Sequence, residues 1–343
     1  MELMKLKYLF LLAIFSPLTF ASLPPSFVGD YEGAYVEAPA NSKQAKNPYL
    51  AGKVVPIKDS IFEVQIFMEF DLRAHYEIKQ EVSLKDGSLQ FKGTDHHFKV
   101  DDSGMTGTFF LREKGKTVSY NYSMNKIVRL SPTLGRKKPE GGIDLFPDNS
   151  LELWEHEKSK PATWKVLDAG VVECFSKKKG NKNGGSIRTK KNFKSCELHL
   201  EFKMPYLPGN TGQNRGNSGL FIHSKYEVQI LDSYGLEGDW RQCGALYKLS
   251  PPKVNMCAPP EQWQTYDIVY QAAQFEESGL LISKPKMTVK HNGVLIHNQQ
   301  VLFDENATKK TMSARSPSNE PGFIQLQDHG HAVQYRNFWI REL

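Results

Sequence analysis

The sequence predicts an all-β protein, in which a smaller antiparallel β domain precedes a larger β-sandwich, or jelly roll. Short segments in which apolar and polar residues alternate recur along the chain, as expected for half-buried strands. Asp-Gly at 86–87 and Asn-Gly at 292–293 each separate two such segments, and these dipeptides are typical of two-residue hairpin turns. Between residues 27 and 130, no segment has a helical pattern longer than two turns.

The first 21 residues have the features of an export signal. Lys5 and Lys7 precede an apolar stretch over 8–15, and a small-residue site ends at Ala21. The apolar stretch is shorter than the roughly 20 residues that a membrane-spanning helix needs. We therefore expect cleavage after Ala21 and a secreted or periplasmic protein without a membrane span.

Length and charge limit the classes of function. The chain has 343 residues and a formal net charge of +6, and its length predicts two domains. The basic clusters at 177–179 and 190–191 flank turn sequence, and no nucleic-acid motif accompanies them, so we expect no nucleic-acid partner. The glycine-rich motifs of nucleotide-binding proteins and the GxSxG motif of serine hydrolases are not found either.

The first domain is expected over residues 22–130, and its role is left unassigned. Strands are predicted over 61–67 and 118–124, and over 82–84 and 89–91 on either side of the Asp-Gly turn. The segment 131–142 is rich in proline, glycine and charged residues, which is typical of a linker.

The second domain is expected over residues 143–343 and is again rich in predicted strands. Their number and their polar connections favour a sandwich of two packed sheets, of which one outer face can bind an extended ligand. The predicted strands cover residues 171–175, 196–203, 219–223, 226–231, 266–270, 286–291, 323–327 and 333–341.

Three of these strands carry two polar residues at alternate positions, which places both side chains on one face. We expect the three strands to be neighbours that form one groove, in which amide, carboxylate and guanidinium groups bind the hydroxyls of a sugar. The pairs are Glu227 with Gln229, Gln325 with Gln327, and Gln334 with Arg336.

The four cysteines are compatible with two disulfides, for which three pairings exist. We favour Cys243–Cys257, because these residues bracket a proline-rich loop, with Cys174–Cys196 as the remaining pair. Cys174 and Cys196 also lie in apolar segments, so buried free thiols are the alternative for them. The spacing of cysteine and histidine does not indicate structural zinc.

A series of motifs in the second domain resembles one known family. The motifs are DLFPDNSL (144–151) with Trp154, NSG (217–219), YEVQILDS (226–233), the segment 243–270, HNGVLIH (291–297), LQDHG (326–330) and YRNFWI (335–340). Together they resemble the 3-keto-disaccharide hydrolase domain family, which has a concanavalin A-like lectin/glucanase fold. The Asn-Met-Cys and Trp-Gln-Thr-Tyr segments are most similar to the subset of that family in planctomycete-type bacteria.

The resemblance implies cleavage of a glycosidic bond in a sugar that is already oxidised to a ketone at carbon 3. The ketone acidifies the hydrogen on carbon 2, so a base can remove it and the group on carbon 1 leaves by elimination. Water then adds to the enone. Such an enzyme needs a general base and a group that stabilises the enolate.

On this interpretation Glu227 is the general base, and His329 or Asp232 donates a proton to the leaving group. Arg336 stabilises the enolate, or else forms a structural ion pair with Glu227. The side chains expected to contact the sugar are Gln229, Gln325, Gln327, His223, Tyr234 and Trp240.

Two other functions and one cofactor stay open. Glu227 and Asp232 are five residues apart, so only a β-bulge would bring both to one face, as a classical retaining β-glucanase requires. A non-catalytic, lectin-like carbohydrate-binding protein is the second alternative. His223, His329, His331 and Asp232 leave a divalent metal open as a cofactor, without an assigned ligand set. The linkage, the aglycone and the oligomeric state are not predicted.

Overall fold

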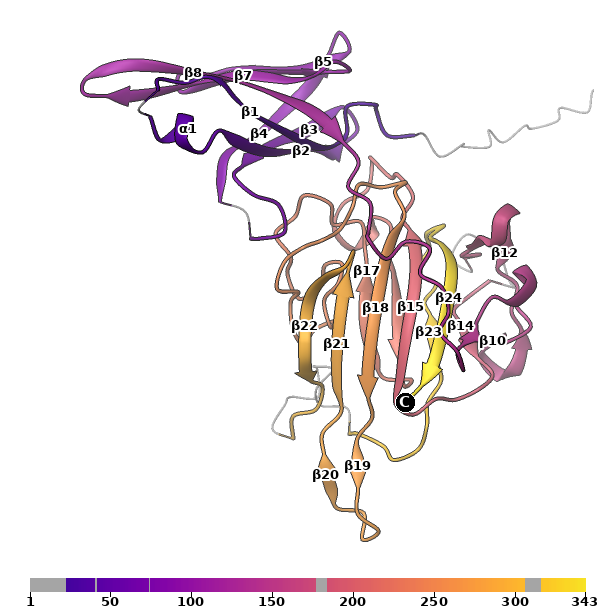
Figure 1. Cartoon of the computed structure of the whole chain (residues 1–343). Coiled ribbons are helices and arrows are strands. Elements are labelled where there is room, and N and C mark those ends of the chain that lie inside the picture. Colours follow the sequence, from indigo (N-terminus) through magenta and orange to yellow (C-terminus); the bar gives the residue numbers. More distant parts are fainter. Residues whose placement is uncertain (1–22, 41, 74, 177–183, 306–315) are drawn as a thin grey trace, which may run out of the picture.

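The computed structural model describes residues 23–40, 42–73, 75–176, 184–305 and 316–343. The expected export signal therefore lies outside the described residues. The all-β prediction is confirmed: a barrel of antiparallel strands is followed by a two-sheet sandwich (Figure 1). In the described part of the chain, no helix has both the length and the apolar character needed to cross a bilayer.

The smaller domain is a closed barrel, because β1 pairs antiparallel with both β2 and β8. Its strands are β1 (Gly29–Glu37), β2 (Tyr49–Lys58), β3 (Ile61–Phe67), β4 (Tyr76–Lys85), β5 (Ser88–Lys92), β6 (His96–Asp101), β7 (Gly104–Glu113) and β8 (Lys116–Ile127). A single helical turn, α1 (Lys43–Lys46), connects β1 to β2. Asp86 and Gly87 both have positive φ in the β4–β5 turn, as the predicted hairpin requires. Buried apolar side chains, such as Tyr31, Val64 and Val100, fill the interior.

The larger domain is a sandwich of two antiparallel sheets. The smaller sheet has the order β11 (Lys160–Pro161), β10 (Trp154–His156), β14 (Ile187–Thr189), β23 (Gln325–Leu326), β16 (Ser218–Ile222) and β17 (Tyr226–Ile230). The larger sheet has the order β12 (Lys165–Val166), β13 (Val172–Glu173), β24 (Gln334–Glu342), β15 (Cys196–Lys203), β18 (Gln264–Gln271), β21 (Lys286–His291) and β22 (Val294–Val301), and β9 (Ile143–Asp144) also pairs with β24. A separate hairpin is formed by β19 (Gln274–Phe275) and β20 (Leu281–Ser283). Apolar side chains from both sheets meet in one core, among them Leu198, Val228 and Tyr335.

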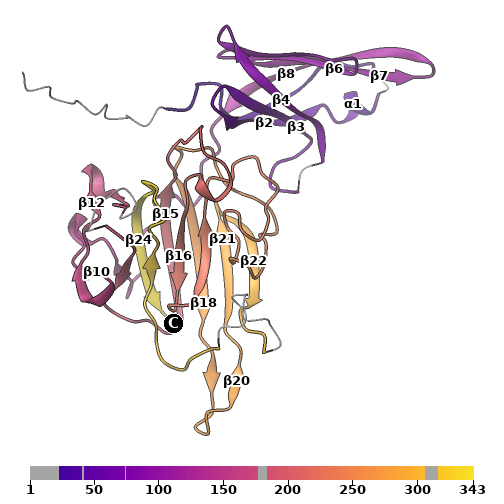
Figure 2. The same ribbon diagram turned by 180° about the vertical axis from the view of Figure 1, so that it is seen from behind.

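The barrel rests on loops at one end of the sandwich, as both views show (Figures 1 and 2). Val55 of β2 belongs to the sandwich core and lies over Gly235, where a Cβ would be 2.2 Å from a Val55 methyl. Polar contacts reinforce this docking: the Tyr234 hydroxyl donates to Asp30 Oδ1 (2.7 Å), and Gln65 Nε2 donates to the Gly235 carbonyl (2.8 Å). The two domains therefore share apolar and polar contacts.

The segment expected to be a linker, 131–142, lies against the outer face of the larger sheet, and we call it the strap. Thr133 Oγ1 donates to Asp267 Oδ2 (2.7 Å), and the Gly135 amide donates to Glu201 Oε1 (2.6 Å). Arg136 forms ion pairs with Asp267 (2.8 Å) and Glu197 (2.7 Å). The strap is thus held to the sheet by side chains of β15 and β18.

Candidate functional site

Glu227, the predicted general base, lies on the outer face of β17. Tyr226, Val228 and Ile230 point into the sandwich core, so Glu227 and Gln229 point outward, as the alternation predicts. Both polar side chains are nevertheless buried. The loop that contains Ala245 pairs with the edge of β17: the backbone amide of Gln229 donates to the Ala245 carbonyl (2.9 Å). Loops therefore surround these two side chains.

The register of the smaller sheet aligns other side chains with Glu227. Phe221 of β16 lies opposite Glu227, and Gln325 of β23 lies opposite Phe221. Arg188 of β14 lies opposite Gln325 and forms an ion pair with Glu155 of β10 (2.9 Å). This face therefore presents a carboxylate, an amide and a guanidinium in one row, although the guanidinium is not that of Arg336.

A glycine allows the Glu227 carboxylate to lie flat on the sheet. A Cβ at Gly219 would be 2.5 Å from Glu227 Oε1, which is closer than such atoms approach in proteins. Gly219 lies opposite Gln229 in the β16–β17 pair, so it belongs to the same face. The close approach fixes where the carboxylate lies relative to the Gln229 amide.

Three amides next to this carboxylate form a small cluster. Gln213 Oε1 accepts from Gln229 Nε2 (3.2 Å) and from Asn217 Nδ2 (3.3 Å). The buried oxygens Gln229 Oε1 and Asn217 Oδ1 have no hydrogen-bond partner among the described residues. A buried polar atom without a partner costs about 1–3 kcal/mol, which a ligand hydroxyl can offset. Sequence reasoning missed Gln213, which lies in a short 3₁₀ turn and not on a patterned strand.

His331 and His329 follow β23 and lie beside the amide cluster. His331 Nδ1 accepts from the Asn217 amide (3.1 Å). The rings of His331 and His329 are nearly parallel, with centroids 6.2 Å apart. Within the described ranges, no group of three or more His, Cys, Asp or Glu residues is arranged to hold a metal ion.

Asp232 has a partner that favours a structural role. Its Oδ2 accepts from Arg215 Nε (2.7 Å), and its Oδ1 accepts from the Tyr234 amide (3.3 Å). Burial raises the pKa of Asp232, although the Arg215 guanidinium opposes that shift. Since this carboxylate is held in a buried ion pair, His329 is the better candidate for the proton donor.

The prediction that three neighbouring strands form the groove is wrong for β24. This strand pairs with β13 and β15, so Gln334 and Arg336 belong to the opposite sheet. Arg336 Nε donates to Glu201 Oε2 (2.7 Å), and its guanidinium lies 4.1 Å from the centroid of the Trp263 ring. Arg336 therefore pairs with Glu201 and not with Glu227. A period of two gives the face of a strand but not the sheet to which the strand belongs.

Three of the predicted sugar contacts are aromatic side chains: His223, Tyr234 and Trp240. Of these three, only Trp240 is exposed (45%). It adjoins Arg241, whose carbonyl accepts from Gln229 Nε2 (3.2 Å), so it lies in a loop at the amide cluster. The His223 ring lies between the sheets, 5.3 Å from the Tyr270 ring, and burial lowers its pKa to about 4. Tyr234 is fully buried at the barrel interface. His223 and Tyr234 therefore do not face the row that contains Glu227.

All four cysteines are buried free thiols, so the predicted Cys243–Cys257 disulfide is not formed in this structure, nor is Cys174–Cys196. The Cys257 thiol donates to the Leu231 and Ala258 carbonyls (both 3.5 Å). Cys243 Sγ also lies 3.2 Å from the Tyr266 hydroxyl. Cys243 and Cys257 both belong to the sandwich core, where they stabilise the fold as polarisable packing groups.

The family to which the sandwich is similar is found by comparison with known proteins. Residues 141–341 match the model of the 3-keto-alpha-glucoside-1,2-lyase-like domain family. A solved protein of Parabacteroides distasonis, provisionally assigned as a glycosyl hydrolase, is 37% identical, with a TM-score of 0.51 over 60% of this chain and 85% of that chain. A second one from the same organism, with the same provisional assignment, is 23% identical and has a TM-score of 0.42 over 59% and 99% of the two chains. No curated protein matches the chain.

Proposed function

Since the chain belongs to the family of 3-keto-alpha-glucoside-1,2-lyase-like domains, we propose that it is a carbohydrate-cleaving enzyme whose active site is the outer face of β16, β17 and β23. The observation that carries this proposal is the position of Glu227. Its carboxylate lies over Gly219, on the same face as Gln229, whose buried Oε1 has no partner among the described residues. The carboxylate can act as a base, and the neighbouring amides can accept hydrogen bonds from sugar hydroxyls and so orient the ring.

The proposed substrate is a glycoside that carries a ketone at carbon 3. Glu227 removes the proton from carbon 2, and the electrons of that C–H bond form a double bond between carbons 1 and 2. The C1–O bond breaks, and His329 gives a proton to the departing oxygen. Water then adds to the enone, with a hydroxyl at carbon 1 and a proton at carbon 2. The amides of Gln213, Asn217 and Gln229 hold the ring during these steps.

The classical retaining route has less support. It requires a second carboxylate about 5–5.5 Å from the first, acting as a nucleophile or an acid. Asp232 is the carboxylate that the sequence offers for this role, and it is held by Arg215 in a buried ion pair. Elimination needs only one carboxylate at the reacting carbon, which is consistent with Glu227 alone.

The test is to incubate the purified protein with a 3-keto-disaccharide and, in parallel, with the unoxidised parent sugar. Released sugar is measured by chromatography and the enone by absorbance. We expect release only from the oxidised sugar, and a decrease of about 10²–10⁴-fold for Glu227→Gln, the usual contribution of a general base. Glu276→Gln, on the exposed β19–β20 side of the sandwich, is the matched control and should be unchanged.

Each other outcome identifies a different function. Release from the parent sugar at a similar rate would favour the glucanase alternative. Sugar binding without release from either substrate would favour the lectin-like alternative. Unchanged turnover by Glu227→Gln would remove this residue from the chemistry.

A further inference from the structure

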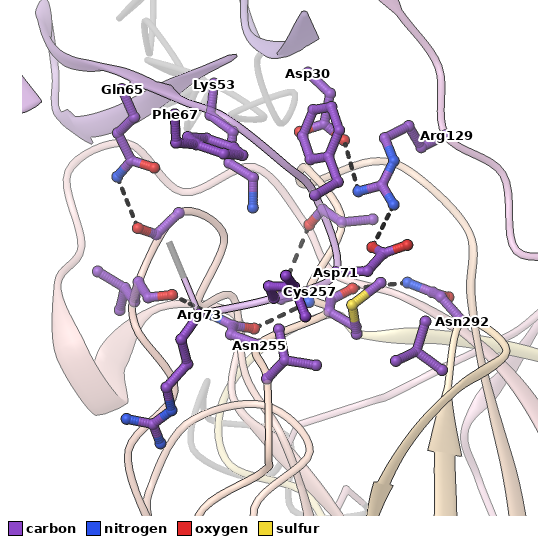
Figure 3. Close-up of a pocket in the computed structure, with 18 of the residues that line it drawn as sticks. Asp30, Lys53, Gln65, Phe67, Asp71, Arg73, Arg129, Asn255, Cys257 and Asn292 are labelled. Carbon is purple, nitrogen blue, oxygen red and sulfur yellow. Dashed lines mark hydrogen bonds and ion pairs between the residues drawn. The ribbon is translucent and has the colours of Figure 1, made fainter. Parts of the chain in front are cut away.

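A cavity lies between the barrel and the sandwich, away from Glu227. Its volume is about 360 Å³, and it is enclosed by strands β2 and β3, the segment 70–73 and three sandwich loops (Figure 3). The loops cover residues 235–237, 254–258 and 292–294. No residue of β16, β17 or β23 lines this cavity, so it is separate from the proposed active site.

Lys53 points its amine into this cavity, as Figure 3 shows. It is the middle residue of a row across the barrel wall, with Asp30 of β1 on one side and Gln65 of β3 on the other. The amine lies 5.3 Å from the centroid of the Tyr234 ring and 5.9 Å from that of Phe67. Among the described residues, none forms a hydrogen bond or ion pair with this amine, so three donors face the cavity.

The acceptors around Lys53 are already engaged. Asp30 accepts from the Tyr234 hydroxyl (2.7 Å) and also lies 3.9 Å from Arg129, which pairs with Asp71. The Asn255 side-chain oxygen accepts from the amide of Cys257 (3.0 Å). Burial lowers the pKa of Lys53, and the nearby negative charge of Asp30 opposes the shift. The acidic and basic side chains that line the cavity are equal in number, but Lys53 has no ion-pair partner among the described residues, and a bound anion would supply one.

Aromatic side chains form part of the cavity wall. The rings of Phe67 and Phe70 meet edge to face at 5.3 Å, and those of Phe67 and Tyr76 at 6.2 Å. Tyr76 and the exposed Arg73 also line the cavity, and Arg73 Nε donates to the Lys253 carbonyl (3.5 Å). Flat aromatic faces suit the C–H groups of a sugar ring, and the volume lies within the usual range of about 300–1,000 Å³ for small-molecule sites.

We propose that this cavity is a second binding site, for an acidic sugar whose carboxylate pairs with Lys53 and whose ring lies against Phe67 and Tyr76. The choice of a sugar rests on the proposed function, whereas the need for an anion rests on Lys53 alone. The barrel then serves to recruit acidic glycans to an enzyme that cleaves them on the sandwich.

The proposal is tested by calorimetric titration of the full-length protein with sodium glucuronate, with glucose and with acetate. We expect glucuronate to bind at least tenfold more tightly than either of the other two. Lys53→Met should weaken glucuronate binding at least tenfold, because the replacement fills the same space without the charge. Lys58→Met, on the exposed end of the same strand, is the matched control and should bind as the wild type does.

The outcomes separate the parts of the proposal. Equal affinity for glucose and glucuronate, or unchanged binding by Lys53→Met, would overturn it. Acetate binding as tightly as glucuronate would overturn the contact with the ring. If Lys53→Met does not fold, the salt dependence of glucuronate binding to the wild type tests the proposal instead. The affinity for glucuronate must then fall at least threefold between 50 and 500 mM chloride.

This result is independent of catalysis. Glu227→Gln should bind glucuronate as the wild type does, because Glu227 does not line the cavity. Failure of the proposed function would therefore leave this titration interpretable.

Discussion

The position of the Glu227 carboxylate depends on a residue without a side chain. Gly219 lies beneath the carboxylate, and a Cβ there would be 2.5 Å from Oε1 and 3.2 Å from both Cδ and Cγ. Alternation along the strand was enough to predict that Glu227 and Gln229 share a face. It could not predict Gln213, because contacts that a folded loop makes with a strand leave no periodic pattern in the sequence.

Gly219→Ala should displace the carboxylate while preserving the fold. The backbone at this position does not have positive φ, so alanine introduces no backbone strain there. We expect kcat for the 3-keto-disaccharide to fall about 10²-fold, the effect of an ångström-scale misplacement of a catalytic group, with a smaller change in KM. Gly209→Ala is the control, since its Cβ would meet only Asp59 Oδ1 at 3.7 Å. An unchanged kcat in a folded Gly219→Ala protein would contradict this role.

At the scale of elements, the strap is held to the larger sheet by buried charges. His199 Nδ1 lies 2.8 Å from Asp267 Oδ1, and Glu201 is close to both His199 and the strap. Composition alone indicated a linker here, because proline, glycine and charge are common to free linkers and to segments that bind a sheet. The difference lies in the partners on β15 and β18, which are more than 60 residues away along the chain.

The ionisation of this cluster predicts how stability depends on pH. Burial opposes charge on all three groups, but their interactions with one another and with neighbouring donors prevail: the pKa of Glu201 falls to about 2, that of Asp267 is lowered, and that of His199 is raised. The carboxylates contribute stability above their unfolded pKa values, near 4, and this is lost as pH falls toward 2. His199 contributes below its unfolded pKa, near 6.5, and this is lost as pH rises through its higher folded pKa.

Urea unfolding between pH 3 and 9 checks this prediction. His199→Gln should lower the free energy of unfolding by about 3 kcal/mol at pH 6, because it removes the buried cation that lies between the Asp267 and Glu201 carboxylates. It should also remove the decline on the alkaline side that His199 causes in the wild type. His156→Gln, on β10 of the smaller sheet, is a control for loss of a histidine. Equal alkaline declines in the wild type and His199→Gln would contradict the assignment.

At the scale of the whole molecule, the sequence predicted what is local and missed what depends on distant contacts. Hairpin turns and alternating strands predicted two β domains, and the family motifs predicted the sandwich. Contacts between distant segments close the barrel and form the cavity at Lys53. They also place β24 in the larger sheet, opposite the sheet that contains Glu227. Such contacts follow from packing of the complete chain, which no single segment encodes.

The measurement that tests the central claim most directly follows the hydrogen on carbon 2. A 3-keto-disaccharide is cleaved in deuterium oxide, and the released 3-keto-sugar is analysed by proton NMR against a reaction without enzyme. Elimination and hydration with Glu227 as the base predict deuterium at carbon 2 of the product, and release and enzymatic exchange that are both about 10²–10⁴-fold slower with Glu227→Gln. A product released by the enzyme with its original hydrogen at carbon 2 would contradict the account, because the bond would then have been cleaved by direct hydrolysis.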